Sequence, residues 1–328
     1  MKYDVILLDV FNLYYRNKGD KNLVLEPWEQ AANCVRFIND QVKSYLKKDG
    51  YLYLLYDPII KSDLGLSKKF SYTTYRQSID PGYKANRHHA ADTQEVVRLI
   101  YTYFNYRGDH ILSVIDNGLE ADDYVGHIIE KYPDKNIALY TTDMDWARYL
   151  SKKVCIIDSS FDDPFSDTDF KKKYGYYPVE SAIIVQKALF GDTSDNITGA
   201  LKLKKTKFIS LDPVDKIGQA FVDQLAKDRT PINEVIAEMK HCSVIRVIDK
   251  IERTPLEEVW LLLESAQSKF NPLSQFFDNV RLIKSRCKNV DDYITWHNPN
   301  EQINKIIETT LGMTKEQPKL KFGGIKIK

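Results

Sequence analysis

The sequence Gly-Leu-Glu-Ala-Asp-Asp at 118–123 places three carboxylates within four residues, directly after the apolar run 111–115. An amphipathic segment, 124–129, follows it. This order predicts a strand, a turn at 117–118 and a helix whose first turn carries the acids. Acids at a helix start interact favourably with the helix dipole, by about 0.3–1 kcal/mol each. Three neighbouring acids also repel one another, and a bound cation is the usual way to offset that repulsion.

The composition is that of an ordinary globular protein, with 43% hydrophobic and 28% charged residues in a chain of 328. This length predicts two domains. No apolar run reaches the roughly 18–20 residues of a membrane span, and no signal peptide is evident, so we expect a cytoplasmic protein without a membrane partner. The four cysteines lie far apart, which suits a reducing compartment and argues against structural zinc. A net charge of +1 does not by itself indicate a nucleic-acid partner.

Apolar runs that alternate with helical patterns predict a parallel sheet with helices on both faces. The expected strands are 5–8, 51–56, 111–115, 137–140 and 154–157, and the first clear helix is expected over about 28–47. Ligands of such sheets bind outside the carboxyl ends of the strands. The acids at or just past four of these ends are Asp9, Asp57, Glu120, Asp122, Asp143 and Asp145. One aspartate at a strand end is common in turns, but four segments with acids at one edge predict a carboxylate-built metal site.

A long insertion, about 58–107, separates the second and third expected strands. Asp80-Pro81-Gly82 has the residue order of a helix start, with an aspartate cap and proline at the first helical position. Lys84 and Arg87 then share one face of the expected helix, and Arg76 precedes them. The segment is either an ordinary solvated basic helix or an element that overhangs the acidic edge.

Beyond residue 190 the pattern becomes mostly helical, as in a smaller second domain. A helix over 183–190 leads into Gly-Asp-Thr-Ser-Asp-Asn-Ile at 191–197, and the cationic run 202–207 follows. We therefore expect a catalytic domain over 1–190, a helical domain over 191–311 and a basic tail over 312–328. The tail alternates apolar residues with lysines, which fits either a flexible tail or a docking peptide.

Five motifs occur in the order seen in the 5′ nucleases, at 8–13, 83–87, 120–123, 142–145 and 191–197. The chain resembles this family, which includes the flap endonucleases, the 5′-nuclease domains of bacterial DNA polymerases and the phage exonucleases with the T-even phage RNase H. A chain of this size without a polymerase is most similar to the phage enzymes. The resemblance covers about residues 3–200. It implies a PIN-like parallel sheet flanked by helices, with a smaller helix-hairpin-helix-like second domain.

The resemblance also implies an activity and its cofactors. The activity is that of a structure-specific 5′-3′ exonuclease or flap endonuclease, which hydrolyses phosphodiester bonds near 5′ ends of DNA or RNA/DNA duplexes in phage replication or primer removal. Two or more Mg²⁺ ions, with Mn²⁺ able to substitute, would serve in two-metal catalysis, and carboxylates with retained waters suit them. The implied metal ligands are Asp9, Asp57, Glu120, Asp122, Asp143, Asp145, Asp192 and Asp195, with Asp123 as an accessory acid.

Basic and aromatic residues receive roles from the same resemblance. The residues implied to act in catalysis are Lys84 and Arg87, on the scissile phosphate from a helical arch, with Asp9, Asp122 and Asp143. Those implied to bind nucleic acid are Arg76, Tyr83, Lys84, Arg87, Lys202, Lys204 and Lys205, with Tyr83 stacked on a base. The implied partners are DNA with 5′ ends, flaps or RNA primers, and a replication protein bound through the tail, with the chain a monomer.

The sequence departs from the family after the 191–197 motif. A glycine-rich hairpin there grips duplex phosphates with its backbone in the family, often with a bound monovalent cation. Lys202 and Lys204 stand in place of the hairpin glycines, which weakens the case for that grip and for K⁺. The lysine side chains either bind the phosphates instead or belong to a solvated loop.

Three other classes of protein compete with this reading. A phosphatase of the haloacid-dehalogenase type needs a second aspartate two residues after its nucleophile, and that position is Phe11. A PIN-type ribonuclease shares the sheet and the acids but is usually far shorter and lacks the helical domain. A non-catalytic nucleic-acid-binding protein gains nothing from carboxylates crowded near phosphates.

Overall fold

The structure is a computed structural model that describes residues 2–17, 25–58, 75–85, 91–105, 110–116, 118–158, 163–201, 211–245, 247, 250–266, 271–284, 305, 308 and 309. Several expectations concern residues outside these ranges. They are Arg87, Lys202, Lys204, Lys205 and the tail 312–328. Within the described ranges, no helix is long and apolar enough to cross a membrane.

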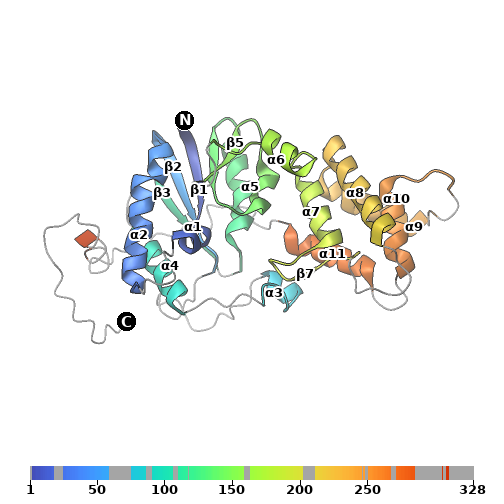
Figure 1. The fold of residues 1–328 in the computed structure, drawn as a ribbon, viewed down its shortest axis with the longest axis horizontal. Coiled ribbons are helices and arrows are strands. Elements are labelled where there is room, and N and C mark those ends of the chain that lie inside the picture. The colour runs from blue at the N-terminus through green and yellow to red at the C-terminus, as the bar shows by residue number, and fades with distance from the viewer. Residues whose placement is uncertain are drawn as a thin grey trace.

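A five-stranded parallel sheet forms the centre of the fold (Figure 1). In spatial order its strands are β3 (Ile111–Val114), β2 (Leu46–Leu55), β1 (Tyr3–Asp9), β4 (Ile137–Tyr140) and β5 (Val154–Ile157). The expected parallel sheet is therefore confirmed. The connections run in opposite directions on either side of β1 and β4, which makes the carboxyl ends of these two strands the topological switch point.

Helices cover both faces of this sheet, and successive side chains of β1 show why. Ile6 and Leu8 point to one face and Val5 and Leu7 to the other, and all four are buried. On the first face pack α1 (Val10–Asn17), α2 (Pro27–Asp40) and α4 (Ala91–Phe104). On the second pack α5 (Ala121–Lys131), the 3-10 helix η3 (Met144–Tyr149), α6 (Asp167–Tyr174) and α7 (Glu180–Phe190).

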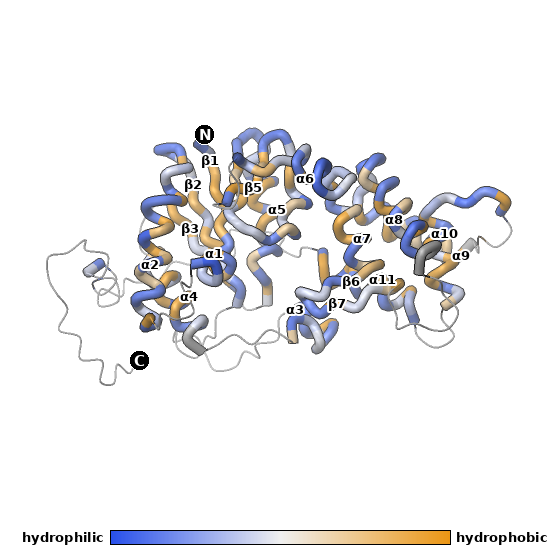
Figure 2. Tube along the Cα trace, in the orientation of Figure 1, coloured by the Kyte–Doolittle hydropathy of each residue, from blue (hydrophilic) through white to orange (hydrophobic). Residues whose placement is uncertain are grey.

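The second face of the sheet continues without a break into the helical part of the chain. A single apolar cluster runs from Val5 through α7 to Ile283. Figure 2 shows the apolar residues along the strands and along α7, which lies between the two parts. The helices beyond α7 are α8 (Leu211–Asp228), α9 (Ile232–Ile245), α10 (Pro255–Ser265) and α11 (Pro272–Ile283). The helical part therefore packs on α7 and is held to the sheet by a shared core.

Two expectations about local structure are wrong. The helix expected over 28–47 ends at Asp40; a short 3-10 helix, η1 (Val42–Tyr45), follows, and Leu46 already pairs with Tyr3 of β1. The start of β2 is therefore set by its pairing with the central strand β1. The helical spacing of apolar residues up to residue 47 did not predict this boundary.

No helix begins at Asp80. Its side chain accepts a hydrogen bond from Gly82 N (2.8 Å) and so forms a turn over 81–85, after the short helix α3 (Tyr75–Ile79). Lys84 has a φ of 53°, which no helix allows. Within the insertion expected over 58–107, α4 packs on the sheet, and its Val97 is buried in the core of the first face.

A short hairpin follows α7, built from β6 (Gly191–Asp192) and β7 (Ile197–Thr198). The chain that leaves it lies directly on α7, where Ala200 N and Leu201 N donate to the carbonyls of Ala188 (3.0 Å) and Leu189 (2.9 Å). Gly199 stands between hairpin and helix. A Cβ at this position would lie 2.3 Å from the carbonyl carbon of Phe190, so only glycine allows this approach.

The substitution Gly199→Ala should lower the free energy of unfolding by about 1–3 kcal/mol, as for other overpacked sites, because backbone atoms must move. Chemical denaturation measures this. Gly118→Ala is the matched control, since a Cβ there meets only Asp116 Oδ1, at 3.5 Å. Equal stability of the two variants would contradict the close packing.

Candidate metal and nuclease site

A pocket of about 290 Å³ opens at the carboxyl ends of the central strands. Its acidic lining residues are Asp9, Asp57, Glu120, Asp122, Asp143, Asp145 and Asp195. The structure therefore brings the acids of four strand ends together with one from the hairpin. Asp192 joins them from β6, since oxygens of Asp145, Asp192 and Asp195 lie within 4.8 Å of one another.

Asn12 holds the two strand ends at the switch point together. Its backbone N–H donates to Asp9 Oδ1 (2.9 Å). Its side chain donates to Thr142 Oγ1 (2.9 Å) and accepts from Thr142 N (3.1 Å), just past β4. Sequence reasoning gave Asn12 no role of its own, although an amide directly after a strand at the predicted edge was a usable signal.

The stretch 118–123 contains both a helix cap and a charged site. Glu120 and Asp123 form a reciprocal capping box at the start of α5, in which Glu120 N donates to Asp123 Oδ2 (3.0 Å). Asp57, from the end of β2, accepts from Ala121 N at the same helix start (2.9 Å). The acidic stretch can therefore serve both as the start of a helix and as part of a cation site, because the caps position the carboxylates around the pocket.

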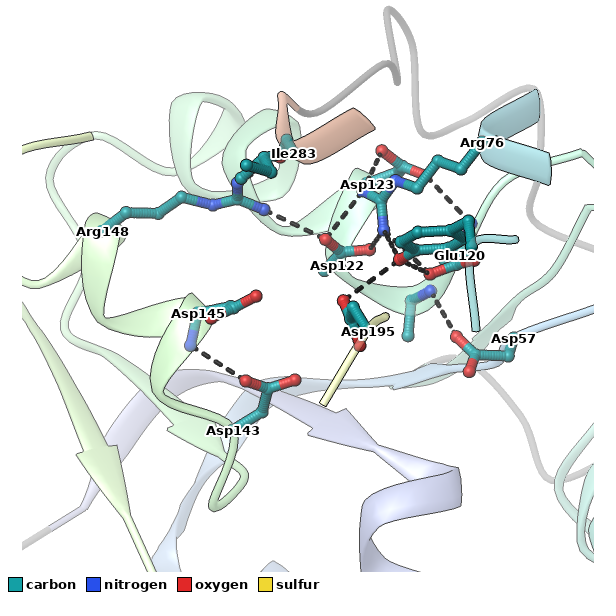
Figure 3. A network of polar contacts seen from close by, with 12 residues as sticks. Asp57, Arg76, Glu120, Asp122, Asp123, Asp143, Asp145, Arg148, Asp195 and Ile283 are labelled. Atoms are coloured by element: carbon teal, nitrogen blue, oxygen red, sulfur yellow. Dashed lines mark hydrogen bonds and ion pairs between the residues drawn. The ribbon is translucent and has the colours of Figure 1, made fainter. Parts of the chain in front are cut away.

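Arg76 neutralises this group of acids from α3. Its guanidinium binds Glu120 (2.8 Å), both oxygens of Asp122 (2.9 and 2.8 Å) and Asp123 (2.9 Å), as Figure 3 shows. Arg76 is only 3% exposed. In this structure it is a buried counter-ion of the carboxylates, and the nucleic-acid contact expected for it would require it to leave them.

Tyr83 and Lys84 point into the same group. The Tyr83 hydroxyl lies 3.0 Å from Glu120 Oε2 and 3.2 Å from Asp195 Oδ2, and its ring is buried, so the ring is not available to stack on a base here. Lys84 Nζ donates to Glu120 Oε2 (2.5 Å) while its backbone N donates to Asp195 O (2.9 Å). Lys84 also lines the pocket, which places its ammonium among the acids.

Two further basic residues, Arg148 and Lys187, reach the acids and were missed from the sequence. Lys187 of α7 forms ion pairs with Asp145 and with Asp192. Arg148 of η3 donates to Asp122 Oδ2 (3.1 Å) and to the carbonyl of Ile283 (2.7 Å). No sequence motif marks either residue, because each depends on how α7 and η3 pack beside the sheet.

The pKa values show where the negative charge is least compensated. Burial, and then the charge of Asp57, raise the pKa of Asp9 to about 8. Asp143 is exposed, and partial desolvation by the surrounding protein together with the neighbouring Asp145 raises its pKa. Burial also opposes ionisation of Asp122, but Arg76 and Arg148 outweigh it and lower its pKa. Within the described part of the chain, no ion pair reaches Asp9, whose ionised form therefore needs another cation.

The donor set fits divalent cations that prefer oxygen. Every acidic ligand candidate is a carboxylate, and neither histidine nor cysteine lines the pocket among the described residues. Lys187 already lies between Asp145 and Asp192, so the protein itself places a positive charge at this cluster. These residues fit a divalent cation that prefers oxygen ligands.

Tyr15 offers an aromatic surface at the same pocket. It lines the pocket from α1 and is 46% exposed, unlike its neighbour Tyr14. The sequence gives no sign of this, because nothing in it distinguishes Tyr15 from the other tyrosines among the 21 in the chain.

A parallel sheet with a carboxylate cluster at its switch point is typical of phosphodiester hydrolases with a site for divalent cations, a class that the comparison with known families supports. The family model for the N-terminal resolvase-like domain of 5′-3′ exonucleases matches residues 5–175, more than half of the chain. The chain therefore belongs to the 5′-3′ exonuclease family and is a nuclease. No match was found among the curated proteins.

Solved structures from bacteriophage T5 share the fold. The T5 5′-exonuclease with bound zinc is 17% identical and has a TM-score of 0.53, with 94% of this chain and 98% of that chain covered. The T5 D15 protein co-crystallised with metal ions is also 17% identical, with the same coverage and a TM-score of 0.51. The PIN-like fold with its helical part is confirmed by this similarity.

Arg76→Met should lower the free energy of unfolding by about 3–5 kcal/mol in EDTA, because two buried carboxylates, Glu120 and Asp123, and the partly buried Asp122 lose their shared partner. Part of the loss should return in Mg²⁺, which stabilises the state that binds it. Thermal and urea unfolding with and without Mg²⁺ measure both effects. Arg36→Met, at an exposed position of α2, should change little, and an equal loss there would contradict the role of Arg76.

Proposed function

We propose that the chain is a structure-specific 5′ nuclease that uses Mg²⁺ to hydrolyse phosphodiester bonds near the 5′ ends of DNA, flaps and RNA primers. One observation carries the proposal: acids from four strand ends and the β6–β7 hairpin line one pocket, and a basic turn lies against them. A binding-only protein would gain nothing from this crowding, because the acids repel phosphates. One of the T5 structures is described as a flap endonuclease in complex with DNA and metal ions, which supports the substrate class.

The carboxylates fall into two groups that would each hold a metal ion. One contains Asp145, Asp192 and Asp195. The other comprises the strand-end acids Asp9, Asp57, Glu120 and Asp143, with Asp122 held between Arg76 and Arg148 and Asp123 behind it as an accessory acid. Bound Mg²⁺ would lower the pKa of an attacking water and offset the charge of the phosphate in the transition state.

Lys84 and Tyr15 would act on the substrate. The Lys84 ammonium pairs with Glu120, so a cation bound to Glu120 would free it to donate to a non-bridging oxygen of the scissile phosphate. Tyr15 presents an exposed ring at the pocket, where a nucleobase can stack. Arg76 would keep Asp122 ionised and oriented throughout.

Other parts of the proposal rest on the family resemblance. Arg87 would join Lys84 at the phosphate, and the Lys202, Lys204 and Lys205 side chains would bind the duplex backbone. The tail 312–328 would bind a replication protein. The protein would act as a monomer in the cytoplasm.

The double substitution Asp143→Asn and Asp145→Asn should abolish Mg²⁺-dependent cleavage of a 5′-labelled flap, because it removes two charged ligands at the centre of the pocket. Binding to the same flap, measured by anisotropy in Ca²⁺ or EDTA, should survive or tighten as repulsion of phosphates decreases. Asp134→Asn, at a 93% exposed position, is the control. Near wild-type cleavage by the double variant would show that the active site lies elsewhere.

Lys84→Ala should lower the single-turnover cleavage rate at saturating enzyme by about 10²-fold, as for the loss of one transition-state donor. Lys153→Ala removes an exposed lysine at the opposite end of the strands and should leave the rate unchanged. A change in the dissociation constant alone, with an unchanged saturated rate, would make Lys84 a general electrostatic contact.

A further inference from the structure

The hairpin that carries Asp192 and Asp195 is too small to hold its own position. Only two residue pairs join β6 to β7, Gly191 with Thr198 and Asp192 with Ile197. Isolated two-stranded hairpins are marginal even when much longer. The placement of these two acids against Asp145 therefore depends on contacts from outside the hairpin.

Asn279 of α11 supplies such contacts to the hairpin. Its amide nitrogen donates to the carbonyl of Ala188 (3.0 Å), which precedes the hairpin, and to that of Thr198 (2.8 Å), which ends it. Its oxygen accepts from Gln275 Nε2 (2.8 Å) on the same helix. Asn279 has no exposed surface, so the two carbonyls have a buried, satisfied partner that joins both ends of the acid-bearing segment.

The end of the same helix reaches the other group of acids. The carbonyl of Ile283, the last residue of α11, accepts from Arg148 (2.7 Å), and the other arm of this guanidinium holds Asp122 (3.1 Å). Figure 3 shows Arg148 between Ile283 and Asp122. Two successive turns of α11 thus reach both groups of acids. Asn279 bonds the backbone on either side of Asp192 and Asp195, and Ile283 bonds Arg148, which holds Asp122.

We propose that α11 is a positioning element of the metal centre, and that Asn279 is the positioning residue that fixes Asp192 and Asp195 relative to the strand-end acids. The inference rests on the proposed function, since it takes these acids to be metal ligands. Asn279 touches neither metal nor substrate; it acts through the carbonyls on either side of the hairpin. The two carbonyls belong to Ala188 and Thr198, which flank the ligands and are not ligands themselves. Residues bonded directly to metal ligands typically change metal affinity 10–100-fold when they are substituted, and we expect an effect at the lower end of that range.

The alternative is that Asn279 only stabilises the core. The two roles differ in what is lost. A purely structural residue changes the unfolding transition and leaves metal affinity of the folded protein unchanged. A positioning residue weakens metal binding at temperatures where the variant is fully folded, and excess metal restores the rate.

The experiment measures Mn²⁺ binding to the full chain by calorimetry, without nucleic acid, for wild type, Asn279→Leu and Asn279→Asp. Leu has the same branching and number of heavy atoms as Asn279, although its methyl groups are larger, and it donates no hydrogen bond. Asp keeps the shape but sets a carboxylate against two carbonyls. At least one Mn²⁺ site should weaken about tenfold or more in both variants. The Mg²⁺ concentration for half-maximal cleavage should rise in parallel, while the rate at saturating Mg²⁺ stays near wild type.

Asp278→Asn is the matched control, because the Asp278 side chain lies in the same helix, is 43% exposed and pairs with Arg281. It should bind Mn²⁺ as wild type does. If the Asn279 variants do not fold, Gln275→Leu tests the inference instead. It removes the hydrogen bond that orients the Asn279 amide and should also weaken Mn²⁺ binding. Unchanged Mn²⁺ affinity in the folded variants overturns the inference alone, whereas a wild type that binds no Mn²⁺ overturns the proposed function beneath it.

Discussion

Mutual repulsion among clustered carboxylates is the constraint on which the rest of this structure depends. Acids from four strand ends and one hairpin face one pocket, and a folded chain can hold them there only with positive charge nearby. Four basic side chains supply part of it from four different elements, namely Arg76, Lys84, Arg148 and Lys187. They leave Asp9 and Asp57 with raised pKa values, and that remaining demand for charge is what divalent cations meet.

The parallel sheet explains why the acids meet where they do. Successive strands end at one edge, and the reversal of order between β1 and β4 leaves a crevice there that short side chains can line. Asn12 joins the two strand ends across the crevice, and the start of α5 adds backbone donors for Asp57. The backbone therefore sets the spacing of the carboxylates before any metal or substrate binds.

The helical part contributes to the same site although it lies beyond the residues that the family model matches. It shares the apolar core of the sheet through α7, and its last described helix contacts both the hairpin and Arg148. A region that packs on the site in this way moves with it, because packed cores move as units rather than deform continuously.

The sequence by itself determined the sheet, its acidic edge and the family, because strand patterns and strand-end acids are local and repeat in a fixed order. It could not show that Asp80 forms a turn, that Tyr83 is buried or that Lys84 pairs with Glu120, since those states depend on neighbours far along the chain. Asn279, Arg148 and Lys187 carry no motif at all. Only tertiary packing decided their roles, because a buried polar group takes its function from whichever partner the fold brings within hydrogen-bonding distance.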